Sequence, residues 1–312
     1  MANVFFNASK DALNNITDAY NFVHPITVSM RYVRNEVASL VSSNPTIDNT
    51  GIQDVIDPTG AVHGVDYRAV FTDITWDNQE EKIAWLLLNN LFAIHEGWAQ
   101  RLYEETFTGY GYTDKFVKNL EMDNLTKKLS SYFLRTGKIS SAMDGAFFDL
   151  YKNQSMLDFG KLDNYMLCYR CFKEARNCYM HGNFVASSRL ITAYNNYLPK
   201  ATLSALDVGE VPIFIPPVSG QQVRLSLRGV IGFSDILRRI IIISDINLLR
   251  ATAAEKEFLD RKPNGWTRKN LSSNPAKAEK QITRYSKKMG FLKATWTADY
   301  QSFLIRNNIF SR

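Results

Sequence analysis

Arg176, Asn177 and His181 form the pattern Arg-Asn-x-x-x-His near the end of an expected helix, and their side chains are of the types needed for acid–base chemistry at a phosphate ester. An imidazole can accept or donate a proton near neutral pH. A guanidinium can bind two phosphoryl oxygens and stabilise the charge that grows on them in a transition state. Asn177 can orient the imidazole or donate to the phosphate. These residue types are compatible with proton transfer at a phosphate ester, a reaction in which the side chains alone supply the acid, the base and the positive charge.

The segment from Phe172 to Asn183 resembles the signature helix of the HEPN superfamily (higher eukaryotes and prokaryotes nucleotide-binding), whose members are all-helical bundles. The resemblance covers this segment sharply, agrees with the number of helices expected over 77–200, and does not extend to 1–76 or 201–312. It implies a metal-independent endoribonuclease with Arg176, Asn177 and His181 as catalytic residues. The 2′-OH of RNA would attack the phosphate and leave 2′,3′-cyclic phosphate and 5′-OH ends.

The resemblance also implies partners. Members of this superfamily are usually homodimers in which both motifs meet at the interface, so a symmetric pair of chains would supply both an acid and a base. RNA is then the substrate, the biological role is that of a toxin or anti-phage abortive-infection effector, and an antitoxin or regulatory protein is a further partner.

Two other functions are compatible with the same residues. One is a non-catalytic HEPN module that binds a nucleotide, a nucleic acid or a partner protein. The other is an all-helical structural or regulatory protein whose motif is coincidental. In that case Arg176 would pair with an acidic residue of the bundle, and His181 would hydrogen-bond the last carbonyls of its helix.

Further polar residues surround the motif. Arg170 and Glu174 continue the line of Asn177 and His181 at steps of about four residues, in a helix that is otherwise largely apolar. A polar seam on a buried helix must be hydrogen-bonded or functional. The following Gly182-Asn183 ends the helix, which would allow His181 to turn back towards the arginine.

Glu96 and Arg101 lie on an earlier expected helix and are candidates to support the motif, if that helix packs beside it. An exposed Glu–Arg pair is the alternative. The neighbouring His95-Glu96 pair does not continue into a zinc-protease pattern, because Ala99 stands where the second histidine would be required.

Helical periodicity predicts a mainly α fold, in which five consecutive helices between 77 and 197 form a bundle. The expected helices span 8–43 (one or two helices, with a break at His24-Pro25), 77–106, 113–136, 140–152, 157 or 161–181, 184–197, 234–261 and 275–289. Val211–Ile215 and Val223–Leu227 are predicted to form a small β-hairpin.

These elements suggest three segments. Residues 1–76 are an N-terminal helical segment with a loop-rich connector that includes strand-like pieces near Ala69-Val70-Phe71. Residues 77–200 are the HEPN-like helical bundle. Residues 201–312 combine the hairpin, a long helix and a basic C-terminal extension. The length is compatible with one large domain or two modest ones.

Composition indicates a cytoplasmic globular protein without membrane segments. The three cysteines lie within Cys168–Cys178, which is no disulfide framework and no zinc pattern, so they are expected to be buried core thiols. The start of the chain lacks the apolar run of a signal peptide, and no apolar run is long enough to cross a bilayer.

Basic residues are concentrated at the end of the chain. Residues 261–312 contain 12 Lys and Arg against two acidic residues, a net charge of +10, which leaves −4 on the remainder of a chain of net charge +6. Such a segment suggests RNA or another polyanion as partner. The candidate RNA-binding residues are Arg268, Lys269, Lys277, Lys280, Arg284, Lys287 and Lys288. The nearby aromatic residues either stack on bases or form the core of a small C-terminal module.

Overall fold

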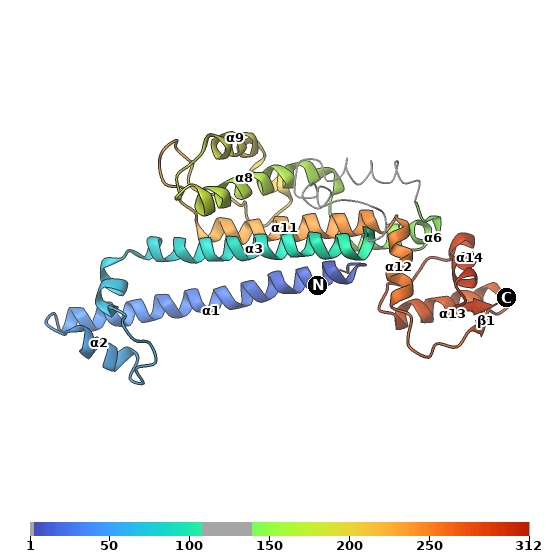
Figure 1. Cartoon of the computed structure of the whole chain (residues 1–312), viewed down its shortest axis with the longest axis horizontal. Helices are drawn as coiled ribbons and strands as arrows, with labels where there is room; N and C mark the ends of the chain where they lie inside the picture. Colours follow the sequence, from blue (N-terminus) through green and yellow to red (C-terminus); the bar gives the residue numbers. More distant parts are fainter. Residues whose placement is uncertain (1–2, 108–138, 312) are drawn as a thin grey trace.

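Three long helices, α1 (Asn7–Ser43), α3 (Trp76–Phe107) and α11 (Leu227–Leu248), lie side by side and form the frame of the protein (Figure 1). The computed structural model describes residues 3–107 and 139–311, and the fold is mainly α-helical, as predicted. The predicted helix at 113–136 lies outside the described residues. The remaining α-helices are α2 (Asn49–Ile56), α6 (Ser141–Met143), α7 (Asp149–Ser155), α8 (Leu162–His181), α9 (Ser188–Tyr197), α10 (Leu203–Leu206), α12 (Thr252–Asp260), α13 (Pro275–Lys288) and α14 (Ala298–Arg306).

Short irregular turns and one small sheet complete the described elements. Single π-helical turns span Ala69–Asp73 and Asp144–Phe148, and 3-10 turns span Phe159–Lys161 and Leu198–Lys200. The strands β1 (Lys269–Asn270) and β2 (Phe310–Ser311) pair in parallel. Within the described residues, no helix combines the length and apolar character needed to cross a membrane.

Helix α11 is the centre of the frame because it is apolar around most of its circumference. Ser226 caps the first turn of α11, and the buried side chains of α11 face α1, α3 and α8. Phe233 of α11 stacks on Phe172 of α8 with ring centroids 4.6 Å apart, and also on Phe92 of α3 at 5.4 Å. The motif helix α8 is therefore held against the frame by aromatic packing along its inner face.

Helices α8 and α9 form an antiparallel pair on one side of the frame (Figure 1). The chain leaves α8 through Asn183 and Phe184, which both have positive φ, and the Phe184 amide donates to the Cys178 carbonyl. This turn closes the C-terminal end of the helix, as Gly182-Asn183 predicted. Trp85, near the start of α3, stacks on Tyr179, near the end of α8, so the two helices run antiparallel.

At the other end of the frame, α12, α13, α14 and the small sheet form a C-terminal module (Figure 1). The core of this module is aromatic, and Phe258 contacts both Phe291 and Tyr300. One continuous cluster of buried apolar side chains extends from Phe5 to Phe310, so the three segments defined from sequence share a core.

The N-terminal residues join this core through a buried carboxylate. The backbone amides of Phe5 and Phe6 donate to the two oxygens of Asp245, at 2.6 and 3.0 Å. The Phe5 ring stacks on Phe291 of the C-terminal module at 4.6 Å. We call Phe5, Phe6 and Asp245 the N-terminal clasp. It ties the first described residues to helix α11 and to the C-terminal module.

The predicted β-hairpin is wrong. Val211–Ile215 and Val223–Leu227 are not paired with each other. Side chains of another helix make hydrogen bonds to the backbone of Val211–Ile215 instead. The hydroxyls of Tyr197 and Tyr194 donate to the carbonyls of Pro212 and Phe214. The segment lies directly on α11, where a Cβ on Gly229 would be only 2.0 Å from the Ile213 carbonyl oxygen. Close packing on a helix thus replaces a strand partner.

Helix α1 and the region that follows it also differ from expectation. Helix α1 continues through Pro25 without a break, and the strand-like residues near Val70 form a π-helical turn. Both stretches are held by tertiary contacts. The two ends of α1 are anchored by α3 and by a small cluster of Val37, Ile52 and Tyr67. The connector contains α2, capped by Asp48.

The long helix predicted at 234–261 is two helices. It begins earlier, at Leu227, and stops at Leu248, and the chain resumes as α12 at Thr252. In between, Ala251 forms a β-bridge with Ile139, and the Ser140 amide donates to the Arg250 carbonyl. These hydrogen bonds to another segment interrupt the helix where the sequence contains no Gly or Pro.

Gly229→Ala is expected to lower the free energy of unfolding by about 1–3 kcal/mol, because the new methyl group would overlap the Ile213 carbonyl and force backbone apart. Chemical denaturation measures the change. Gly97→Ala on α3 is the matched control, since no described atom lies within 4 Å of a Cβ there, and it should cause no loss of stability. Equal losses in both variants would contradict the close approach.

Candidate functional site

Arg176 points from α8 towards α3. Its Nη1 lies 2.7 Å from Oε1 of Glu96, and its guanidinium carbon is 5.5 Å from the ring centroid of Phe92. The Nε of Arg176 is buried, and no described residue offers it an acceptor. The guanidinium is thus anchored on one side by a carboxylate and an aromatic face, while one N–H remains without a hydrogen bond.

His181 occupies the last position of α8 and is exposed, whereas Asn177 is half-buried. At about 100° per residue, Asn177 and His181 share a face of the helix, but Arg176 and His181 are about 140° apart. His181 keeps helical geometry and does not turn back towards Arg176, contrary to the expectation from Gly182. Within one chain the two principal motif residues therefore face different directions.

The polar seam of α8 lies on its outer surface, which corrects the expectation of a buried seam. Arg170 is exposed, and Glu174 is half-buried. Both line a pocket of about 260 Å³ between α8 and α9, together with Ser188, Arg189, Thr192, Ala193 and Asn196. The residues from α9 were not singled out from the sequence. Their spacing at 188, 192 and 196 was the available signal, because it places three polar side chains on one helix face.

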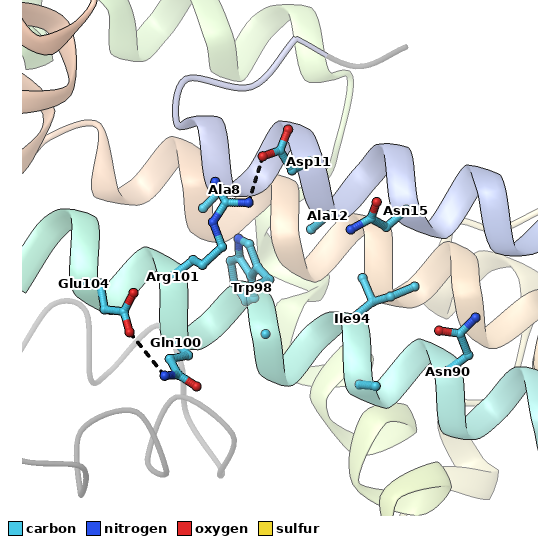
Figure 2. A pocket seen from close by; sticks show the side chains of 12 residues that line it. Ala8, Asp11, Ala12, Asn15, Asn90, Ile94, Trp98, Gln100, Arg101 and Glu104 are labelled. Atoms are coloured by element: carbon cyan, nitrogen blue, oxygen red, sulfur yellow. Dashed lines mark hydrogen bonds and ion pairs between the residues drawn. The ribbon is translucent and has the colours of Figure 1, made fainter.

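Of the two candidate supporting residues on α3, the structure places Glu96 at the motif and Arg101 elsewhere. Arg101 donates to Asp11 of α1 at 2.8 Å, beside Gln100 and Glu104, in a groove of about 480 Å³ between α1 and α3 (Figure 2). The two residues are five positions apart on one helix, so they face about 140° apart. Arg101 is part of a different surface.

Three cysteines and one histidine of this region are buried. Cys168, Cys171 and Cys178 are free thiols in the core, as expected, and burial raises the pKa of Cys168 and Cys171. His95 is buried with its Nδ1 3.3 Å from the Tyr169 hydroxyl, and burial lowers the pKa of His95 to about 3. Its imidazole is therefore neutral near pH 7 and does not supply a charged acid.

The candidate RNA-binding residues lie on the C-terminal module, and all seven are exposed. Lys269 and Lys288 lie over the ring of Trp266, at 5.0 and 5.7 Å from its centroid. Tyr285 and Phe291 are buried in the core of the module. For these two aromatic residues, the prediction of a small C-terminal module with an aromatic core is confirmed.

This basic surface is distant from the motif along the frame. The C-terminal module lies where α11 ends, whereas α8 ends near the start of α3 (Figure 1). A helix of the length of α3 spans about 48 Å. The structure does not bring the basic residues together with Arg176 and His181.

Among residues 3–107 and 139–311, no group of three His, Cys, Asp or Glu side chains is arranged to hold a metal ion. No protein-family model, curated protein or solved structure matches the chain.

Proposed function

We propose that the protein is a metal-independent endoribonuclease with Arg176, Asn177 and His181 as its catalytic residues. The observation that carries the proposal is the state of Arg176, whose guanidinium is anchored by Glu96 and Phe92 and retains a buried Nε without an acceptor. An exposed imidazole follows on the same helix. This combination matches what cleavage of a phosphodiester requires from side chains alone.

In the proposed reaction, the imidazole of His181 takes the proton of the 2′-OH, and the 2′-oxygen attacks the adjacent phosphorus. The bond from phosphorus to the 5′-oxygen breaks, and a second imidazole protonates the departing oxygen. Arg176 binds the non-bridging oxygens as their charge increases. The products are a 2′,3′-cyclic phosphate and a 5′-OH, so no oxidant, reductant or co-substrate is needed.

A complete site would need two copies of the chain, because Arg176 and His181 of one copy diverge around α8. Exposed apolar side chains at the end of α8 and in the turn that follows it support this association: Met180 (52% exposed), Phe184 (36% exposed) and Val185 (39% exposed). A symmetric dimer would bury this patch and supply both imidazoles to one site. We place such an enzyme in the cytoplasm as a toxin or anti-phage effector, restrained by an antitoxin or regulatory protein, with the basic C-terminal module holding distant parts of the RNA.

The test is cleavage of a labelled mixed-sequence RNA by the full chain in EDTA, with analysis of the new ends. We expect fragments that end in 2′,3′-cyclic phosphate and begin with 5′-OH. Intact RNA, or fragments with 5′-phosphate ends, would overturn the proposal.

Glu96→Gln is expected to reduce kcat about 10- to 100-fold with little change in KM, because the uncharged amide holds the Arg176 guanidinium less firmly and a small misplacement slows a positioned reaction. Glu96→Asp should restore part of the activity. Arg101→Ala removes a different ion pair of the same helix and should leave the rate unchanged. A loss of similar size in Arg101→Ala would show that Glu96 acts only through the stability of α3.

A second function is favoured by one observation: Arg176 already has a carboxylate partner within its own chain. A non-catalytic module that binds a nucleotide, a nucleic acid or a protein would retain this ion pair as structure. That function predicts RNA binding of equal strength in wild type and His181→Ala, with no cleavage by either.

A further inference from the structure

The pocket between α8 and α9 has a composition that the motif does not explain. Arg170 and Glu174 are one helical turn apart on α8, and Ser188, Thr192 and Asn196 follow each other at the same interval on α9. The two helices run antiparallel, so the two rows of polar side chains face each other across the pocket. Its volume of about 260 Å³ lies just below the range of pockets that hold drug-sized ligands, and it suits a single small unit.

The charged and polar groups of the pocket indicate the chemical class of its ligand. Two guanidinium groups, of Arg170 and Arg189, provide cationic donors, and Arg189 forms no ion pair with any described acidic residue. Glu174 contributes a carboxylate, which would repel a bare anion. Hydroxyl and amide groups of Ser188, Thr192 and Asn196 complete the lining. A ligand that suits all of them carries both phosphate oxygens and hydroxyl donors, as a ribose-phosphate unit does.

The pocket also shares a surface with the motif. Arg170, Glu174, Asn177 and His181 fall within about 60° around α8, and Glu174 precedes His181 by about 10 Å along the helix axis. A strand with one phosphate at His181 would therefore pass its neighbouring nucleotide over the pocket.

We propose that the α8–α9 pocket binds the nucleotide next to the cleaved bond, with Arg170 and Arg189 on its phosphate and Glu174 on its ribose hydroxyls. This inference rests on the proposed ribonuclease function, because it takes the substrate to be an RNA strand that also reaches His181. It assigns to the pocket a part in substrate binding and no part in the chemical step.

The test begins with binding, using the full chain with His181→Ala so that cleavage does not interfere. A short labelled oligoribonucleotide should bind about 10-fold more weakly when Arg189→Ala is added, since a charged bidentate contact is lost. Glu174→Gln should reduce the preference for the oligoribonucleotide over the matching oligodeoxyribonucleotide. Arg31→Ala removes an exposed arginine of α1 and is the matched control, with no expected change.

Two competitors identify the source of the phosphate. Neither a nucleoside monophosphate nor inorganic phosphate should displace the oligoribonucleotide when the competitor is added at a concentration near the Kd of the oligoribonucleotide. Each competitor offers only part of the contacts. Displacement by the monophosphate at such concentrations would overturn the strand subsite in favour of a free-nucleotide site. Displacement by inorganic phosphate would overturn it in favour of a simple anion site.

Cleavage kinetics separate this inference from the proposed function. In the otherwise wild-type chain, Arg189→Ala should raise KM about 10-fold and leave kcat within about twofold. Cleavage with an unchanged KM in Arg189→Ala would overturn the subsite and leave the ribonuclease in place. If the wild-type chain does not cleave RNA but binds the oligoribonucleotide in a way that depends on Arg189, the ribonuclease function is overturned and the pocket remains a nucleotide-binding site.

Discussion

His181→Ala is expected to reduce the single-turnover rate of RNA cleavage in EDTA about 100- to 10,000-fold, the usual contribution of a positioned acid or base. Arg176→Ala should cause a loss of comparable size, because the charge on the phosphoryl oxygens then has no guanidinium partner. His63→Ala is the matched control, since this histidine is exposed and lies in the connector before α3. Equal cleavage by wild type and His181→Ala would exclude the motif as the catalytic site.

Mixing wild type with His181→Ala tests whether a site is shared between chains. If one site uses His181 of both chains, a hybrid dimer has a single imidazole and does not cleave. An equal mixture allowed to exchange subunits should then retain about a quarter of the wild-type rate, since about a quarter of its dimers contain two wild-type chains. Half of the wild-type rate would place the whole site within a single chain.

Asp245→Ala is expected to lower the free energy of unfolding by about 2–6 kcal/mol, because it leaves the buried amides of Phe5 and Phe6 without an acceptor. It also releases the N-terminal clasp from α11. Urea denaturation of the full chain measures the loss. A loss below about 1 kcal/mol would mean that water or another group replaces the carboxylate without cost.

The stability of the wild type should also depend on pH through this residue. Burial raises the pKa of Asp245 to about 7, against the opposing hydrogen bonds from Phe5 and Phe6. Between about pH 4 and pH 7 the folded chain then holds a proton that the unfolded chain has released. The free energy of unfolding should fall across this window as pH rises, by at most about 4 kcal/mol from this group, and Asp245→Ala should lack that part of the slope. Identical pH profiles for the two proteins would contradict the raised pKa.

Several helix ends were predictable because local signals define them. The end of α8 follows from Gly182-Asn183, and the start of α13 follows from Asn274, which caps the helix, and Pro275 in its first turn. The failures occur where distant contacts decide the structure. Residues 211–215 look like a strand by composition, yet they lie on a helix whose Gly229 permits the approach.

The same limit applies to the site. Arg176, Asn177 and His181 are visible in the sequence as a spacing, and Glu96 was a candidate only by its place on a neighbouring helix. Its contact with Arg176 joins residues 80 positions apart, and no local pattern predicts such a partner. The sequence does not predict the pocket formed with α9 for a related reason. Its residue types are ordinary on an exposed helix, and only the antiparallel packing of α9 on α8 brings them to one pocket with Arg170 and Glu174.

The N-terminal clasp has a consequence for the order of events during synthesis. Phe5 packs on Phe291, a residue that is 286 positions later in the chain. At ordinary rates of translation, roughly 15 to 60 s separate the two residues on the ribosome. Helix α8 is complete well before that, so a nascent chain carries the whole motif, and Phe147 and Tyr151 to contact the Phe5 ring, before Phe291 exists to stack on it. During this interval one face of the Phe5 ring is open to chaperones or to other chains.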